Sequence, residues 1–531
     1  MQEADCNSNR HSITHVVIRV GCNKNQYGVI TKLKNAQCYH SFSNKSLNMT
    51  IKEKSEFDLK FYPHFDEHVS LEKIEAIVIN PVKVAQHPFF PFLEYTKKQR
   101  KFGRTYKERK IRYASRLSSY IFTHYRGILS EKYERSLIEN NIRDYPLAYR
   151  KIVDTVSGEQ FGKCNIHFAK EAFDEISKRG ACFAICLDIS SFFDSIDHNK
   201  LYELWCNLLM TSELPDDHQA LFNAITSYTV VDRDDCYVRL GYMVETLVRG
   251  KIQKKLTRPA KHIPMQLCTP KIFREKICSG LDKLTRKNNK KYGLPQGAPL
   301  SDLLANLYLL NFDGEISSLE KKLGGYYRRY SDDILFICTN KEEIPLIINC
   351  IKRELKLVGE ELKINDKKTN ITEFYYDSET LRCRPLNGKN NSQKPMEYLG
   401  FSFDGQQVLI KNSTLSGYFR NMKYESRRQA SLLIRDFPKK KLEEILLIGQ
   451  KRFPYICQKY GNIEDFDEEK VDCKQWNFRS YATKASRVMQ LNGGHRILHQ
   501  LRDSKKRLKR FLEIEIQKAY YKKRQSLHTK E

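Results

Sequence analysis

The chain has 531 residues, of which 92 are Lys or Arg and 64 are Asp or Glu, so its formal net charge at pH 7 is +28. This length predicts about three or four packed units, and 40% hydrophobic residues exclude a mostly disordered protein. The positive charge favours a polyanionic partner, above all a nucleic acid. The 15 cysteines include no CxxC pair, which excludes zinc ribbons and a secreted disulfide framework. Without a long apolar run or a signal-peptide pattern, we expect a cytoplasmic protein with no membrane partner.

Residues 1–90 contain the stretches THVVIRV, YGVITKL and EKIEAIVINPVKV, whose apolar patterns predict short strands. No residue pattern indicates what this part does. Between Lys97 and Arg116 the chain then places ten Lys or Arg against the single acid Glu108, with aromatic residues interleaved. Such a stretch can follow a phosphate backbone and stack on bases, although a solvated helix face is the alternative.

Residues 131–177 have a helical pattern, and ACFAICLDI then predicts a buried strand that ends on Asp188. A carboxylate at the carboxyl end of a strand is well placed to bind a cation. Residues 199–290 are mixed and basic and carry no strong motif. The next motif, YGLPQGAPLSDLLANLYL, predicts a loop in which Gly293 and Gly297 let the backbone approach a ligand, followed by a helix from Leu300.

The segment RRYSDDILFI predicts a hairpin whose turn carries Asp332 and Asp333. Adjacent carboxylates repel each other and persist where they are hydrogen-bonded or bind a cation. Magnesium prefers such hard oxygen ligands, and two magnesium ions can drive phosphoryl transfer. Taken alone, a pair of aspartates is more often a surface turn.

Together and in this order, LDISSFFDSI, YGLPQGAPL and YSDD resemble the motifs of reverse transcriptases, and the resemblance extends from about Phe92 to Gly405. It implies an α+β fold of the right-hand polymerase type, with an antiparallel sheet and helices in the palm. The expected boundaries are an N-terminal extension of unknown role at 1–90, fingers at 91–186, a palm at 187–405 with an insertion at about 199–290, and a basic helical thumb and C-terminal extension at 406–531.

The resemblance also implies the catalytic residues. Two Mg²⁺ ions, or Mn²⁺ in their place, would be held by Asp188, Asp332, Asp333 and the carbonyl of Ile189. The motif LKINDKKTNI would supply Lys368 as the proton donor to pyrophosphate, with Lys367 as a near-equal alternative.

Further residues are implied as substrate contacts. Phe193 would be the steric gate that favours deoxynucleotides. The other nucleotide-binding candidates are Gln296 and Gly297 of the loop, Arg109 and then Arg112 of the fingers, and Arg150 in AYRK. The turn in EYLGFSF would be the primer grip, formed by Tyr398, Leu399 and Gly400.

Three longer segments, among them AYRKIVDTVSGEQFGKCNIHFAKEAF and NFRSYATKAS, resemble bacterial defence-associated reverse transcriptases, including the abortive-infection type. This implies an RNA-directed DNA polymerase in anti-phage defence that uses deoxynucleoside triphosphates, a noncoding RNA as template or scaffold and a DNA product, in some members as a homo-oligomer. The alternatives are a template-independent or protein-primed DNA polymerase of the abortive-infection type, and a group II intron or retron-like enzyme. The bulky Phe193 argues against an RNA-synthesising polymerase, and the intact acids argue against an inactive RNA-binding scaffold.

Overall fold

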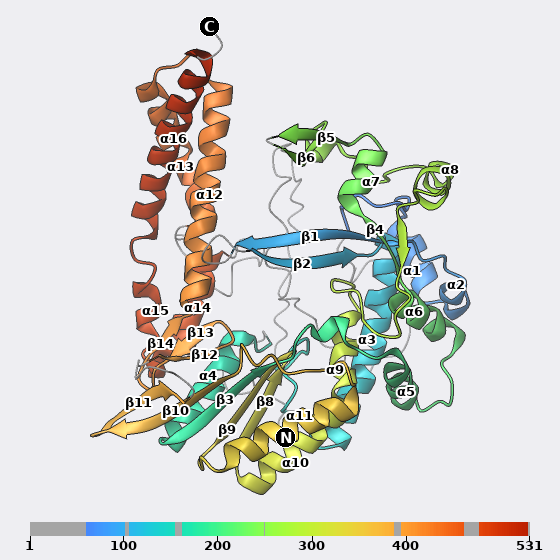
Figure 1. The fold of residues 1–531 in the computed structure, drawn as a ribbon, viewed down its shortest axis with the longest axis vertical. Coiled ribbons are helices and arrows are strands. Elements are labelled where there is room, and N and C mark those ends of the chain that lie inside the picture. Colours follow the sequence, from blue (N-terminus) through green and yellow to red (C-terminus); the bar gives the residue numbers. More distant parts are fainter. Residues whose placement is uncertain are drawn as a thin grey trace, which may run out of the picture.

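The computed structural model describes residues 60–100, 106–153, 162–248, 250–386, 394–460 and 477–528 (Figure 1). The predicted strands THVVIRV and YGVITKL lie outside these ranges. The third predicted strand, EKIEAIVINPVKV, is wrong, because this segment forms helices α1 (Leu71–Val78) and α2 (Pro81–Ala85). Ile74 and Val78 are buried four residues apart, on one helical face.

A four-stranded sheet has the order β2-β1-β4-β7. Its first pair is the antiparallel ribbon of β1 (Phe92–Arg100) and β2 (Tyr106–Tyr113), and β1 also runs parallel to β4 (Thr229–Asp232), which pairs with β7 (Thr285–Lys287). Residues 199–290 were expected as an insertion into the palm. They instead supply two strands, β4 and β7, to the sheet that contains the basic β1–β2 ribbon.

A second sheet, with the order β11-β10-β3-β9-β8, is entirely antiparallel. Its strands are β3 (Cys182–Asp188), β8 (Tyr326–Tyr330), β9 (Asp333–Cys338), β10 (Asn370–Asp377) and β11 (Thr380–Pro385). Strand β3 thus pairs with the strands of the expected palm, although the boundaries drawn from the sequence place residues up to 186 in the fingers.

Alternate side chains of β3 enter two different cores, as the period of two in a strand requires. Ile185 and Leu187 pack with the helices on one face, and Cys182 and Ala184 pack with those on the other face. The first face is covered by α10 (Leu310–Leu323) and α11 (Glu343–Val358), and the second by α4 (Asn165–Arg179).

Further helices pack around the four-stranded sheet and the first core. They are α3 (Arg116–Glu139), α5 (His198–Leu209), α6 (Asp216–Thr226), α7 (Arg233–Arg239), α8 (Pro270–Ile272) and α9 (Ser301–Tyr308). The helical pattern predicted for 131–177 is interrupted, because α3 ends at Glu139 and α4 begins only at Asn165. A separate ribbon, β5 (Met243–Val248) with β6 (Lys251–Leu256), projects beyond α7.

The C-terminal part is largely helical, as the sequence predicts. A small sheet of β12 (Met396–Tyr398), β13 (Phe401–Phe403) and β14 (Val408–Ile410) leads into α12 (Asn412–Asp436). The remaining helices are α13 (Leu442–Tyr460), α14 (Phe478–Val488), α15 (His495–His499) and α16 (Ser504–His528), and α12, α13 and α16 form an upright bundle (Figure 1). Within the described ranges no helix has the length and apolar character needed to cross a bilayer. The described residues thus confirm the predicted α+β class.

Candidate active site

The three predicted acids meet where β3 ends and β9 begins. Asp188 is the last residue of β3 and lies directly opposite Asp333, the first residue of β9. Asp332 lies in the turn between β8 and β9, and its carbonyl accepts a hydrogen bond from the Ile189 amide at 3.0 Å. The pairing of β3 with β9 therefore joins residues about 145 positions apart in the chain.

The turn that carries Asp332 is held in an unfavourable backbone conformation. Ser331 has a φ of 59°, in the left-handed region, which costs an L-residue about 1–2 kcal/mol. Two neighbours compensate for this cost. The Tyr149 hydroxyl donates to Ser331 Oγ at 3.3 Å, and Arg329 Nη1 donates to the Ser331 carbonyl at 3.1 Å.

Arg329 is itself fixed by a buried ion pair. Its Nη2 and Nε atoms lie 2.6 and 2.8 Å from the two carboxylate oxygens of Asp313 on α10, and both side chains are 0% exposed. Asn306 of α9 accepts a further hydrogen bond from Arg329 at 3.1 Å. A charged pair with its remaining donors satisfied restricts the geometry of its surroundings. The turn is thus anchored through β8 to two palm-side helices.

The electrostatics of the acids favour a bound cation. Asp333 lies on the open side of the site, yet the surrounding protein partly desolvates its carboxyl group, and this desolvation, followed by the charges of Asp332 and Asp188, raises the pKa of Asp333 to about 7. Burial and the nearby Asp188 also raise the pKa of Asp332. A cation would relieve this repulsion between carboxylates.

Lys368 already places a positive charge at this position. The segment that carries it runs beside the end of β3, where the Asn365 amide donates to the Asp188 carbonyl at 2.8 Å. The Lys368 ammonium then contacts both carboxylate oxygens of Asp188, at 2.5 and 2.6 Å. In the part of the chain that the structure describes, no three His, Cys, Asp or Glu side chains are already arranged around one point as a metal site. The ammonium group on Asp188 shows that this position attracts positive charge. The hard oxygen donors of Asp188, Asp332, Asp333 and the Ile189 carbonyl fit a divalent cation and could hold one.

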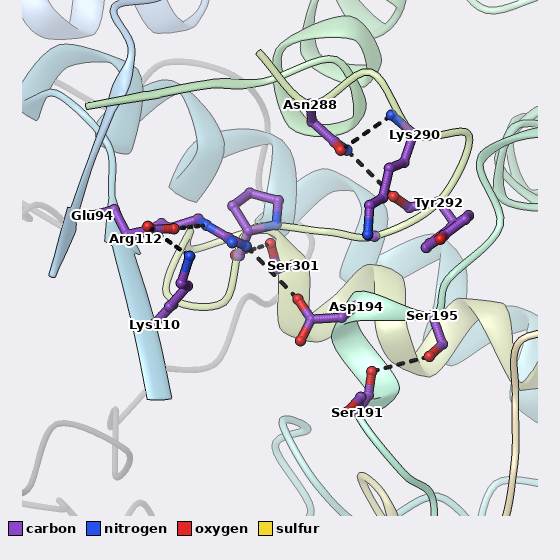
Figure 2. Close-up of polar contacts among 12 residues, drawn as sticks. Glu94, Lys110, Arg112, Ser191, Asp194, Ser195, Asn288, Lys290, Tyr292 and Ser301 are labelled. Carbon is purple, nitrogen blue, oxygen red and sulfur yellow. Dashed lines mark hydrogen bonds and ion pairs between the residues drawn. The ribbon is translucent and has the colours of Figure 1, made fainter. Parts of the chain in front are cut away.

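The loop Leu294–Gly297 is fixed beside Phe193. The Leu294 amide donates to the Phe193 carbonyl at 2.7 Å, and the Arg112 amide of β2 donates to the Gln296 carbonyl at 3.0 Å (Figure 2 shows the Arg112 side chain at this loop). Gly297 has a φ of 117°, and a Cβ there would lie only 2.6 Å from the Arg112 carbonyl. Glycine is therefore required for the loop to approach β2, whatever contact it makes with a nucleotide.

Basic side chains gather around one buried carboxylate on β1. Glu94 lies 2.8 Å from Arg112 and 3.3 Å from Lys110 (Figure 2). It also lies 3.3 Å from Arg286 of β7. Although burial acts against its charge, Arg112 and Lys110 hold the pKa of Glu94 below its usual value. Arg112 also extends to within 3.9 Å of Asp194, which directly follows Phe193.

Arg109, the first choice from the sequence among the fingers residues, lies on the other face of the β1–β2 ribbon. Arg112 and Lys110 are two residues apart on β2 and share the face of Glu94. Because successive strand residues alternate between faces, Arg109 points away from Asp194. Lys110 and Arg286 are therefore basic residues that sequence reasoning missed, and only the strand register reveals them.

The prediction that Arg150 binds the nucleotide is corrected by the structure, because the side chain of Arg150 is occupied by protein contacts. Its guanidinium is paired with both carboxylate oxygens of Glu134 at 2.7 Å, also donates to the carbonyls of Arg143 and Pro146, and is 1% exposed. Its neighbour Tyr149, in the same AYRK motif, is the residue that reaches the Ser331 turn. The AYRK motif therefore does mark a segment that reaches the site, but the residue that makes the contact is Tyr149 and not Arg150.

The predicted primer grip is divided between core and surface. The Tyr398 side chain is buried in the second core, 4% exposed, so it has no access to a primer. The tight turn at Leu399 and Gly400, with φ values of 44° and 92°, is more open, and Asn165 of α4 donates to the Leu399 carbonyl at 3.0 Å.

Comparisons with known proteins agree with the position of these motifs. Residues 250–403 match the family model described as "Reverse transcriptase (RNA-dependent DNA polymerase)". The chain is 38% identical over 81 residues to the retron Ec73 reverse transcriptase of Escherichia coli, covering 15% of this chain and 26% of that protein. It is 32% identical over 96 residues to the retron Mx162 reverse transcriptase of Myxococcus xanthus, covering 18% and 20%. The matches thus span about a quarter or less of these relatives.

A solved structure of apo telomerase from Candida Tropicalis, truncated from its C-terminal domain, aligns with 62% of this chain and 58% of its own, at 13% identity and a TM-score of 0.35. Asp188 and Phe193 precede the residues that the family model matches, and the pairing of β3 with β9 brings Asp188 to them. Residues 250–403, which include the LPQG loop, the YSDD turn and Lys368, are thus the part of the chain that is similar to the reverse transcriptase family.

Proposed function

We propose that this protein is an RNA-directed DNA polymerase that adds deoxynucleotides by two-metal phosphoryl transfer. The observation that carries the proposal is the meeting of Asp188 with Asp332 and Asp333 at a strand end and turn beside a segment of the reverse transcriptase family. Raised pKa values at Asp332 and Asp333 support a site made to receive positive charge.

Two magnesium ions, when bound by Asp188, Asp332, Asp333 and the Ile189 carbonyl, would supply Lewis acidity for the attacking 3′-hydroxyl and the leaving diphosphate. The protein's own part is to position the groups that react. The buried Arg329 fixes the turn, so Asp332 needs no rearrangement during the reaction. Lys368, carried by the segment beside Asp188, holds the proton for the leaving pyrophosphate.

The sugar and phosphates of the nucleotide would meet three features. The ring of Phe193 would crowd a ribose 2′-hydroxyl, and Gln296 and Gly297 would contact the sugar and base. Arg112 takes the place of Arg109 as the main fingers contact to the triphosphate, since it shares a ribbon face with Lys110 and approaches Asp194. The turn at Gly400 would approach the primer end.

The similarity to retron reverse transcriptases, together with the defence-type segments, supports a role in bacterial anti-phage defence with a noncoding RNA as template or scaffold. The second candidate is a template-independent or protein-primed polymerase of the abortive-infection type. The same three acids would serve both, so the product distinguishes them.

The test is nucleotide addition by the purified chain on an RNA template with a DNA primer, with Asp332→Asn as the inactive variant. Asp366→Asn is the matched control, because Asp366 is a surface aspartate of the Lys368 segment, 82% exposed. We expect the first variant to lose about 10³-fold or more in rate, as expected when transition-state charge stabilisation is removed, and the control to keep its activity. Equal activity of Asp332→Asn and wild type would refute the proposal.

Sequencing of the nucleic acid that copurifies with the protein separates the two candidates. DNA complementary to one discrete RNA indicates templated synthesis, whereas DNA of simple sequence joined to a protein hydroxyl indicates the protein-primed alternative. Replacing Phe193 with Val should admit ribonucleotides, and unchanged sugar selectivity would place the gate elsewhere.

A further inference from the structure

The ribbon of β5 and β6 is a sheet of only two strands. Apart from its ends at Met243 and Leu256, which pack against a third buried cluster that includes Phe65 and Tyr237, its strand residues are exposed on both faces. An isolated hairpin is marginally stable in water, and three strands or a packed face are normally needed for stability. Among the residues that the structure describes, nothing packs over the outer part of this ribbon.

Its tip is apolar. Leu247 and Ile252 lie directly opposite each other across the strands and are 76% and 67% exposed. Val248, on the other face, is 41% exposed. Exposed apolar side chains concentrated at one projecting point usually mark an interaction site.

The flanks of the same ribbon are basic. Residues 243–256 contain four Lys or Arg and one acid, Glu245. Lys254 is shared between Asp235 of α7 and Glu245, which lies 3.7 Å away. Lys251 and Lys255 are exposed on the opposite face of the ribbon from Leu247 and Ile252, the face that carries Val248. This charge suits a polyanion rather than a second copy of a chain that carries +28 itself.

The root of the ribbon is firmly attached. The Tyr242 hydroxyl donates to the Leu267 carbonyl at 2.7 Å, and the Thr257 amide donates to the Tyr242 carbonyl at 3.0 Å. In Figure 1 the ribbon projects from the same body as the β1–β2 ribbon, toward the side of the α12, α13 and α16 bundle. The exposed apolar side chains are therefore held in a fixed position relative to the rest of the protein.

We propose that the β5–β6 ribbon is a wedge for base-paired nucleic acid. Leu247 and Ile252 on one face would insert between the bases at the opening of a duplex, while Lys251 and Lys255 on the other face bind phosphates of the separated strand. Apolar wedges of this kind offset part of the cost of unstacking a base step. The inference rests on the proposed function, since a polymerase that copies a structured RNA must open the helices ahead of it.

The direct test needs no polymerisation. The full chain is mixed, without nucleotides, with an RNA hairpin that carries 2-aminopurine at its opening base pair, whose fluorescence rises on unstacking. Wild type should raise the signal, and the double variant Leu247→Ser with Ile252→Ser should lose most of that rise. Leu357→Ser is the matched control, because Leu357 is a 71% exposed leucine on α11. An equal rise with the double variant would overturn the proposal.

Synthesis provides the second measurement. On a template that contains a stable hairpin the double variant should extend about tenfold more slowly than wild type, which corresponds to a loss of about 1.4 kcal/mol of the unstacking cost that the wedge offsets. On an unstructured template both should extend alike. If wild type extends neither template, the polymerase proposal fails, while the fluorescence result still decides the wedge. A change in oligomeric state with an unchanged fluorescence signal would show that the ribbon is a protein interface and refute the wedge.

Discussion

The buried pair of Asp313 and Arg329 predicts a large loss of stability on removal of the acid. Both side chains are 0% exposed, and the carboxylate receives two guanidinium hydrogen bonds, at 2.6 and 2.8 Å, and one from the Tyr327 hydroxyl at 2.7 Å. In Asp313→Ala the guanidinium keeps only Asn306 and the Ser331 carbonyl as acceptors. Breaking a buried pair in this way costs about 3–5 kcal/mol, a large part of the total stability of an ordinary protein.

A chain of this size does not unfold in one step, so the assay is native-state hydrogen exchange of peptides from α10 and from β8–β9. The matched variant combines Asp313→Leu, Arg329→Met and Tyr327→Phe, which removes both charges and the dependent hydroxyl. Replacing a whole buried pair with apolar residues is often neutral, so this variant should keep most of its protection. It should lose nucleotide addition, because the Ser331 turn then lacks the Arg329 hydrogen bond and keeps only that from Tyr149. A loss below about 1 kcal/mol in Asp313→Ala would refute the reasoning, since it would fall within the range of an ordinary substitution.

Three further predictions concern other parts of the site. The pKa of Asp333 is raised to about 7 in the fold, whereas an unfolded aspartate titrates at about pH 4, so ionisation of this group favours the unfolded state. In metal-free buffer the melting temperature should therefore fall from about pH 4 to about pH 7 and change little above that, less so in Asp333→Asn, and magnesium should restore it mainly at the higher pH. Gly297→Ala should cost about 2 kcal/mol and impair nucleotide addition because its Cβ would contact the Arg112 carbonyl, whereas Gly314→Ala, with nothing within 4 Å, should be neutral or stabilising in the same denaturation assay. Arg150→Ala should cost about 1–3 kcal/mol through its lost hydrogen bonds and leave the KM for deoxynucleotides unchanged; a raised KM at unchanged stability would return Arg150 to nucleotide binding.

The sequence by itself determined those features that depend on neighbouring residues. The apolar run before Asp188 predicts strand β3, and the apolar runs on both sides of YSDD predict the hairpin of β8 and β9. Alternation and turn chemistry act over a few residues, so a single sequence displays them directly. The turn at Gly400 was expected from the resemblance of EYLGFSF to the primer grip, and the structure has a positive φ there.

Only the tertiary structure decided which side chains reach the site. Arg112 rather than Arg109 lies near Asp194, and Arg150 is paired with Glu134. The Ser331 turn is held by Arg329, which is itself paired with the buried Asp313. It also joined residues of the expected insertion to β1 by a parallel strand pair. These outcomes depend on strand register and on partners far apart in the chain. Neither the register nor the distant partners produce a periodic pattern in the sequence. A shift of one residue in strand pairing would reverse the face of every side chain and leave the pattern that predicts the strand unchanged.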